Sequence, residues 1–421
     1  MKSAALMAAL ALAMPLAQAQ APAPADPAGD PISTLVGQLD LEKYKATIKS
    51  LTRFGDRRQG TERNRQALDW IEAQLKSYGC TNTERLQYQY TQPAPDAPPA
   101  KRAPGIPSGG AGGPPGQGGS TLFGNRAPIG VNTDPMLQPD EKLRALNAEQ
   151  TPVGTSQREN VYCTKVGTTH PEEMYIVSAH MDGIGFGEAA NDDGSGTALV
   201  MELARIFSAP GVETDRSIRF ALWNNEETGL NGATAYAMQR KDLQGIESPK
   251  GSGKYPEPKW LGMIQHDMMM WDHGMPIPKL DAAGKPALDA KGQVVYVSPP
   301  EQRREADVNI EYQSVSKQAE ASARLAWAFR AANDKYATNY PAAVGFHMTN
   351  TDSSPFMDLV PAISLRENER GMQIGAGWDP NWHQPSDVYA TYSDKDFLLG
   401  LNAAQTTLAG VAQLAGARIR K

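Results

Sequence analysis

Imidazole and carboxylate side chains follow two apolar runs near the middle of this 421-residue sequence. The first run ends at His180 and Asp182, and the second ends just before Glu226 and Glu227. Nitrogen and hard oxygen atoms gathered in one place are the ligands that zinc and similar divalent ions prefer. Adjacent carboxylates point in different directions, so one can bind a metal while the other holds a proton. The sequence therefore indicates metal-dependent acid–base chemistry.

Two further aspartates, Asp192 and Asp193, lie between those runs within an Asn-Asp-Asp-Gly-Ser-Gly sequence. They directly precede an apolar segment that predicts a helix, and aspartate is a common N-cap of helices. Capping is the role that we expect for Asp193. Two acids and two glycines are more than a cap needs, which leaves a further role open for Asp192.

The apolar runs predict the strands that position these groups. Residues 174–179, 217–223 and 260–265 have the composition of buried strands, and residues 197–207 have that of a helix. Strands and helices alternate beyond residue 161, which predicts an α/β sandwich with a mainly parallel central sheet flanked by helices. Open α/β sheets place their active sites beyond the carboxyl ends of the strands. The candidate groups stand at those ends.

Further elements follow from apolar residues at helical or alternating spacing. The predicted helices are residues 41–54, 62–78, 315–329 and 396–414, and the predicted strands are residues 84–90, 160–163, 308–312 and 361–365. We expect Thr61 to cap the second helix and residues 84–90 to form an edge strand. The last helix is predicted to be amphipathic.

The first 19 residues predict export. A charged start, an apolar core at residues 4–16 and an Ala-Gln-Ala site have the three parts of a secretory signal peptide. The apolar core is too short for a membrane span, and no later stretch approaches the roughly 18 apolar residues that a span needs. We therefore expect a periplasmic or secreted protein with no membrane span.

The two cysteines, Cys80 and Cys163, bear on the same question. Two buried free thiols are one interpretation, but in an oxidising compartment an even number of cysteines favours a disulfide. A loop of this size would stabilise the fold by roughly 4 kcal/mol. We expect the bond.

Low-complexity segments divide the chain. Residues 20–36 are expected to be a disordered start of the mature protein, and residues 37–421 a single domain. Residues 92–120, which are rich in Pro and Gly, predict a surface insertion, and residues 274–304 a long excursion near the site. The net charge of -6 is mild and spread out, so no nucleic-acid partner is expected.

Five motifs, taken together and in order, resemble the M28 family of zinc-dependent exopeptidases. They are His180-Met181-Asp182, Asn191-Asp192-Asp193-Gly194-Ser195-Gly196, Glu226-Glu227-Thr228-Gly229-Leu230, His266-Asp267-Met268 and His383-Gln384-Pro385-Ser386-Asp387. The early turn at residues 57–61 and the Thr351-Asp352-Ser353 element are also similar to the family's. The resemblance covers most of the chain and implies the zinc-exopeptidase type of three-layer fold.

The resemblance also implies two zinc ions per chain. Asp192 would bridge both ions, His180 and Asp267 would complete the protein ligands of one, and Glu227 and His383 those of the other. A shared carboxylate suits this role because it holds two ions about 3.5–4 Å apart.

The family's general base is matched by Glu226, and a partner of the His180 ring by Asp182. Zinc lowers the pKa of a bound water towards about 7, and Glu226 could take the proton as the water attacks a peptide carbonyl. The expectation is therefore an exported aminopeptidase that acts on peptides.

Three alternatives stay open. A carboxypeptidase or dipeptidase of the same family would need a cation for the terminal carboxylate; Arg366 could supply it, although a surface ion pair is the simpler role. A single-zinc glutaminyl cyclase has a similar fold, but the presence of both His180 and Asp267 favours two ions. A binding domain without turnover would not need Glu226.

The sequence departs from the family pattern near the last histidine. Members often have a tyrosine or another donor there, whereas Trp382 precedes His383, so the side-chain oxyanion donor is unassigned. His266 and His347 are expected to be structural. Asp272 and His273 also lie near Asp267 but are not taken as ligands, and residues 268–271 are expected to fill the core.

Overall fold

The computed structural model describes residues 29–80, 82–94, 131–272, 279–292, 295, 308–337, 339–346, 348, 351–367 and 379–420. The chain divides into one unit at Met1–Asp30 and a second, compact unit at Pro31–Lys421. The expected signal peptide, most of the insertion at residues 92–120 and about half of the excursion at residues 274–304 lie outside the described residues.

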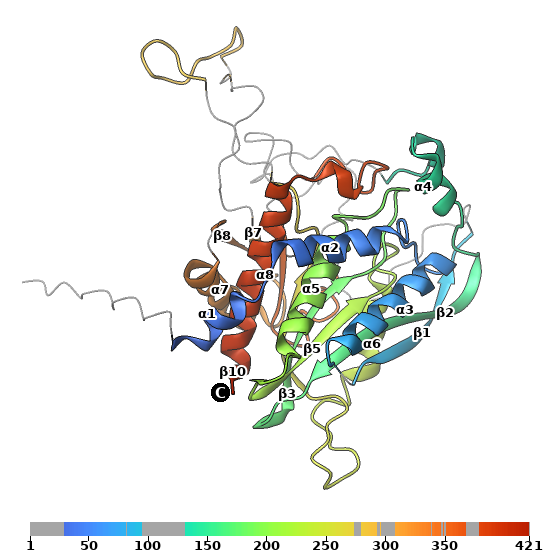
Figure 1. The fold of residues 1–421 in the computed structure, drawn as a ribbon, viewed down its shortest axis with the longest axis vertical. Coiled ribbons are helices and arrows are strands. Elements are labelled where there is room, and N and C mark those ends of the chain that lie inside the picture. The colour runs from blue at the N-terminus through green and yellow to red at the C-terminus, as the bar shows by residue number, and fades with distance from the viewer. Residues whose placement is uncertain are drawn as a thin grey trace, which may run out of the picture. The chain divides into compact units, whose positions relative to one another are not determined.

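An eight-stranded sheet forms the centre of the second unit, in the order β1-β2-β5-β3-β6-β9-β7-β8 (Figure 1). Its strands are β1 (Glu84–Gln92), β2 (Gly154–Lys165), β3 (His170–His180), β5 (Arg216–Trp223), β6 (Lys259–His266), β7 (Val308–Glu311), β8 (Ala342–Gly345) and β9 (Ala362–Glu367). The four central strands β5, β3, β6 and β9 are parallel, as are β7 and β8. The pairs β1–β2, β2–β5 and β7–β9 are antiparallel. The sheet is thus mixed, with the parallel centre that the sequence predicts.

Strand β3 shows why the central strands are apolar throughout. Tyr175, Val177 and Ala179 lie in one hydrophobic cluster, and Met174 and Ile176 lie in a second. Alternate residues of a strand point to opposite faces, so helices or loops cover both faces of the sheet. The edge strand β1 instead alternates buried and exposed residues, as predicted.

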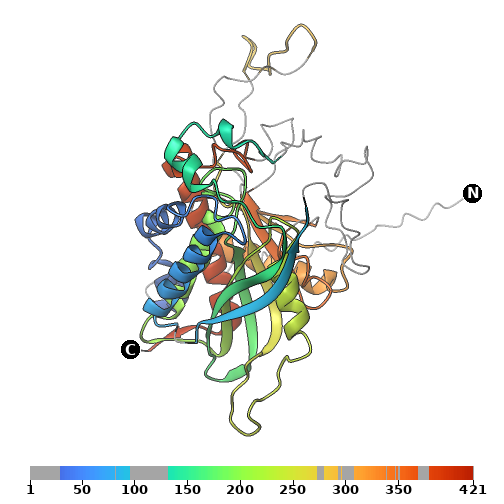
Figure 2. The same ribbon diagram turned by 90° about the vertical axis from the view of Figure 1, so that its right-hand side faces the viewer.

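Eight α-helices surround the sheet. They are α1 (Pro31–Val36), α2 (Leu41–Thr52), α3 (Glu62–Ser77), α4 (Glu141–Leu146), α5 (Gly194–Phe207), α6 (Asn231–Arg240), α7 (Ala319–Tyr336) and α8 (Asp394–Ala415), a count that applies to the described residues. Buried residues of α2, α3, α5, α7 and α8 join the first cluster, and those of α6 join the second. Helices α2 and α3 accordingly lie across the sheet from α6 (Figure 2). The predicted three-layer α/β architecture is confirmed.

Three predictions about helices need correction. Residues 31–36 are not part of a disordered start: they form α1, because Leu35 and Val36 are buried in the first cluster. Helix α7 begins at Ala319 rather than at residue 315, and Val315 is exposed in the turn before it. Helix α8 is buried on almost all sides rather than amphipathic, because α1, α2, α5 and α7 all pack against it.

Two local predictions are confirmed. The Thr61 side chain accepts a hydrogen bond from the Asn64 backbone N–H and so caps α3. Cys80 and Cys163 form a disulfide that joins the end of the α3 segment to β2. No helix of the described part of the chain is long and apolar enough to cross a membrane.

Candidate metal centre

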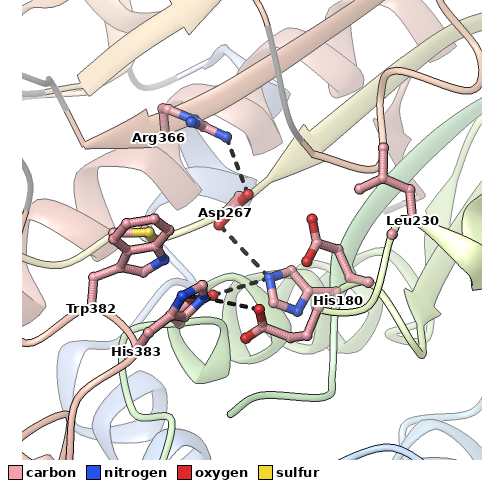
Figure 3. A pocket seen from close by; sticks show the side chains of 11 residues that line it. His180, Leu230, Asp267, Arg366, Trp382 and His383 are labelled. Carbon is pink, nitrogen blue, oxygen red and sulfur yellow. Dashed lines mark hydrogen bonds and ion pairs between the residues drawn. The ribbon is translucent and has the colours of Figure 1, made fainter. Parts of the chain in front are cut away.

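A pocket at the carboxyl ends of β3, β5 and β6 collects polar side chains from distant parts of the chain (Figure 3). Its lining residues are His180, Asp192, Glu226, Glu227, Gly229, Leu230, Asp267, Met268, Arg366, Trp382 and His383. All five side chains that we predicted as metal ligands are among them, together with Glu226. Asp182 lies beside the pocket, fully buried, and does not line it.

The Asp192 carboxylate lies between two imidazoles. Its Oδ1 is 3.1 Å from Nε2 of His180, and its Oδ2 is 3.0 Å from Nε2 of His383. The same His383 nitrogen is 2.9 Å from Oε2 of Glu227, and the same His180 nitrogen is 3.8 Å from Oδ1 of Asp267. Each histidine therefore faces one oxygen of the shared aspartate and one further carboxylate.

These separations fit metal coordination. Ligand atoms about 2.0–2.2 Å from a tetrahedral zinc ion lie roughly 3.3 Å from each other. His180, Asp192 and Glu227 each offer a ligand atom, and these atoms all lie within 4.8 Å of one another. Oε1 of Glu227 is buried without a hydrogen-bond partner among the described residues. A buried carboxylate oxygen without a partner is costly unless a cation satisfies it, so this donor set fits divalent cations.

Backbone contacts orient the His180 ring. Its Nδ1 lies 3.0 Å from the backbone carbonyl oxygen of Asp182, which fixes the proton on Nδ1 and leaves Nε2 free for a metal. The Asp182 carboxylate is farther away, with Oδ1 at 3.8 Å from Nδ1, and accepts a hydrogen bond from the Glu226 backbone N–H at 3.0 Å. Asp182 thus links the loops that carry His180 and Glu226.

Asp193 caps α5, as predicted, and also does more. Its Oδ1 accepts hydrogen bonds from the backbone N–H groups of Gly196 at 2.8 Å and Met268 at 3.2 Å, and its Oδ2 accepts from that of His180 at 3.2 Å. One buried carboxylate therefore holds together the start of α5 and the ends of β3 and β6. The neighbouring Asp192 side chain faces the pocket instead.

Glycines let the His383 loop approach the turn that follows β3. A Cβ atom on Gly185 would lie 2.4 Å from the His383 backbone, and one on Gly187 would lie 2.7 Å from the Asp387 carbonyl oxygen. Only glycine fits at such distances. The backbone is also strained at several non-glycine residues of this region that have positive φ angles, among them His383, Leu230 and Met268. Strain of this kind is typical of functional sites.

Behind Asp192 lies a carboxylate to which the sequence analysis gave no role. Asp387 accepts hydrogen bonds from the backbone N–H groups of Asn191 at 2.9 Å and Asp192 at 3.2 Å, and from the Tyr392 hydroxyl at 2.8 Å. Burial, with the charge of Asp379 nearby, raises the pKa of Asp387 to about 7. The Asp387 position within the last motif was the only signal of this role.

Arg366 is the clearest difference from the sequence analysis. It is a residue of β9, it is 4% exposed, and its Nη2 lies 3.1 Å from Oδ2 of Asp267. The surface ion pair that we expected is therefore a buried ion pair with a candidate metal ligand. The neighbouring strands β6 and β9 create this contact, and their pairing is not readable from the sequence.

The pocket has an excess of acidic side chains, which favours the binding of positive charge. Burial raises the pKa of Glu226 well above its usual value, and the charges of Asp352, Glu227 and Asp267 add to the effect. Burial and the charge of Asp192 raise the pKa of Glu227 to about 7. Burial alone would lower the pKa of His180, but the surrounding carboxylates, Glu226 foremost, raise it well above the usual value. Protons or cations must compensate this cluster of acids.

The remaining predictions near the pocket have mixed outcomes. Met269 and Met270 fill the core as expected, but Met268 lines the pocket, as does Trp382, which stacks on His383 with ring centroids 4.2 Å apart. His266 is structural, with Nδ1 at 3.0 Å from the Ser178 carbonyl and Nε2 at 2.8 Å from the Thr407 hydroxyl. Asp272 lies outside the pocket and accepts a hydrogen bond from the Tyr340 hydroxyl. His273 and His347 lie outside the described residues.

Comparison with known proteins identifies the family and the fold of the chain. The family model described as peptidase family M28 matches residues 160–405. The chain belongs to peptidase family M28. The match includes the five motifs that suggested this family, whereas the early turn at residues 57–61 lies outside the matched residues.

Two curated relatives match shorter stretches of the chain. Aminopeptidase YwaD of Bacillus subtilis is 34% identical over 110 residues, which are 25% of this chain and 22% of that protein. Carboxypeptidase Q of Xenopus laevis is 34% identical over 89 residues, which are 21% of this chain and 19% of that protein. The chain thus matches about a fifth of the length of these relatives.

Solved structures share the fold over almost the whole chain. The aminopeptidase from Aneurinibacillus sp. strain AM-1 has a TM-score of 0.55 at 20% identity, covering 93% of this chain and 97% of its own. The glutaminyl cyclase of Porphyromonas gingivalis has a TM-score of 0.51 at 14% identity, covering 89% of this chain and 99% of its own. At these identities the likeness is one of fold alone.

Proposed function

We propose that this M28 peptidase is an exported aminopeptidase with two zinc ions, which removes N-terminal residues from peptides. The observation that carries the proposal is the position of Asp192, whose two oxygens face two different histidines. A shared carboxylate is the ligand that two-metal hydrolytic sites use. His180 and Asp267 would complete the protein ligands of one ion, and Glu227 and His383 those of the other.

Bound zinc would supply Lewis acidity, by polarising the peptide carbonyl and by lowering the pKa of water. The side chains of the pocket then have separate tasks. The Glu226 carboxylate accepts the proton of the attacking water and delivers it to the leaving amine. Burial raises the pKa of Glu226, and nearby cations would lower it again, towards the neutral range that suits a general base. Asp182 holds the Glu226 backbone in place.

The basic side chain in the described pocket lining is not available to a substrate carboxylate. That lining includes the carboxylates of Asp192, Glu226, Glu227 and Asp267, and its one arginine, Arg366, is ion-paired with Asp267. Two zinc ions would offset the four carboxylates, so a C-terminal carboxylate would need a further cation, whereas a substrate amine can bind a carboxylate oxygen. This supports an aminopeptidase over the carboxypeptidase or dipeptidase alternative.

Export is part of the proposal. The Cys80–Cys163 disulfide is typical of oxidising compartments, and the first 19 residues have the pattern of a signal peptide. We therefore place the enzyme in the periplasm or outside the cell.

The test compares substrates and a base variant. We expect the zinc-loaded protein to hydrolyse an aminoacyl anilide with a free amine, and to leave its N-acetylated form and an N-blocked peptide intact. Glu226→Gln should retain two zinc ions by elemental analysis and lose roughly 10³-fold in kcat. The matched control is Glu202→Gln, which changes a buried glutamate of α5 that pairs with Arg205 outside the pocket.

Other results would redirect the assignment. Normal turnover by Glu226→Gln would remove that residue from the role of base. Faster cleavage of the N-blocked peptide would indicate a carboxypeptidase. One zinc ion per chain, with cyclisation of an N-terminal glutaminyl peptide, would indicate a cyclase.

A further inference from the structure

Among the described residues that line the pocket, Arg366 is the only arginine or lysine. Its guanidinium is buried and lies on the side of Asp267 opposite His180, so that Asp267 stands between the two (Figure 3). Nη2 of Arg366 is 3.1 Å from Oδ2 of Asp267, which leaves Oδ1 to face His180. One candidate ligand therefore has a positively charged guanidinium beside its other oxygen.

Glu227, the corresponding carboxylate of the other ligand set, has no such partner among the described residues. Oε2 of Glu227 is 2.9 Å from His383, and Oε1 is buried without a hydrogen bond in the described part of the chain. Glu227 thus has no ion pair with an arginine or lysine in the described part of the chain, and both of its oxygens can face a cation. The two ligand sets, which look alike in the sequence, differ in charge.

We propose that Arg366 makes the two metal positions unequal, so that zinc held by Glu227 and His383 is bound more tightly than zinc held by His180 and Asp267. The inference rests on the proposed function, because it takes both ligand sets from there. A guanidinium beside Asp267 repels a divalent cation and draws electron density from its ligand, and burial strengthens both effects.

The hydrogen bonds of the two histidine rings favour the opposite order of zinc affinities. Nδ1 of His180 has the Asp182 carbonyl as its acceptor, whereas Nδ1 of His383 is buried with no hydrogen-bond partner among the described residues. An acceptor on the second ring nitrogen makes a histidine a better ligand, which favours the His180 position. A unit charge next to a ligand oxygen outweighs the dipole of one carbonyl, so the Arg366 effect decides the order.

The test measures zinc affinity at each position alone. His383→Ala leaves the His180 and Asp267 position, and His180→Ala leaves the Glu227 and His383 position. Zinc binding is measured at pH 8 by competition with a chromophoric chelator. We expect His180→Ala to bind one zinc at least about tenfold more tightly than His383→Ala, the scale on which neighbours of ligands act.

Substitutions of Arg366 then identify the cause. Arg366→Gln, which keeps a hydrogen-bond donor but removes the charge, should tighten zinc at least about tenfold in the His383→Ala background. In the His180→Ala background the same change should alter the affinity by less than about threefold, because Arg366 contacts Asp267 and not Glu227. Arg366→Lys keeps the charge and should behave like arginine in both backgrounds.

The outcomes separate this inference from the proposed function. A wild-type protein that binds fewer than two zinc ions refutes the two-metal centre and the inference with it. Two bound ions, with weaker or unchanged affinity in Arg366→Gln, or with equal shifts at both positions, refute the inference alone. If Arg366→Gln does not fold by circular dichroism, the comparison of His180→Ala with His383→Ala still decides: tighter binding by His383→Ala overturns the proposed order.

Discussion

Asp193 offers a direct test of how the centre is held together. We expect Asp193→Asn to lower the free energy of unfolding of the metal-free protein by about 3 kcal/mol. The substitution keeps the size of the side chain and removes none of the proposed metal ligands. Its effect should therefore report on the hydrogen bonds that join α5, β3 and β6.

The magnitude follows from the three backbone N–H groups that the carboxylate accepts, those of Gly196, Met268 and His180. An asparagine has one acceptor oxygen, so its amide group must face at least one of these donors, and a buried donor left without a partner costs about 1–3 kcal/mol. Loss of the negative charge at the start of α5 adds about 0.5–1 kcal/mol. Together the two contributions span roughly 1.5–4 kcal/mol, and about 3 kcal/mol lies near the middle of that range.

The assay is urea unfolding in the presence of a chelator, and Asp140→Asn is the matched control. Asp140 also caps a helix, by accepting hydrogen bonds from Lys142 and Leu143, but it is exposed. Asparagine caps helices about as well as aspartate, so the control should change stability by less than about 0.5 kcal/mol. Equal stabilities of Asp193→Asn and Asp140→Asn would show that Asp193 is an ordinary cap and refute the reasoning.

Two further predictions concern stability. Replacing Cys80 and Cys163 together by alanine should cost about 4.5 kcal/mol, because the disulfide closes a loop with a sequence separation of 83; the variant should no longer respond to a reducing agent, and a loss under about 1 kcal/mol would contradict the prediction. Burial lowers the pKa of His266 to about 4, so between its ordinary value near 6.5 and pH 4 the unfolded chain binds a proton that the folded chain does not. Stability should therefore fall by about 3 kcal/mol as the pH drops through this window. His266→Gln should remove that part of the decline in urea unfolding at pH 7.5, 5.5 and 4.5, and identical declines in both proteins would be evidence against it.

Local patterns were enough to predict much of the fold. The run that becomes β3 is buried on both faces, and the alternating residues of β1 mark an edge. Thr61 and Asp193 stand directly before helices and cap them. In each case the residues that predict the element form it or lie within a few positions of it. The local sequence is therefore enough for the prediction.

Buried polar residues distinguish α8 from the amphipathic helix that was predicted. Asn402, Thr406 and Thr407 are all buried. Asn402 accepts hydrogen bonds from the backbone near Tyr340, and Thr407 contacts His266. Their partners lie more than 60 positions away, so periodicity alone could not distinguish a solvated face from a satisfied buried one.

The order of the strands also limited what could be predicted at the site. The ends of β3, β5 and β6 were expected to meet, and the pocket brings their polar groups together. The contact between Arg366 and Asp267 joins residues 99 positions apart and depends on β9 lying beside β6. No local pattern specifies which strand pairs with which. The positive charge of Arg366 beside Asp267 therefore became visible only in the structure.

The candidate metal ligands and Glu226 come from β3, from the turn before α5, from the ends of β5 and β6, and from the segment before α8. A nascent chain that has not yet extended to His383 can therefore display only part of this set. The complete set exists only after the polypeptide has passed His383 and the sheet has closed. A chain that crosses a membrane unfolded would leave its cations behind and take them from whatever supply its destination offers.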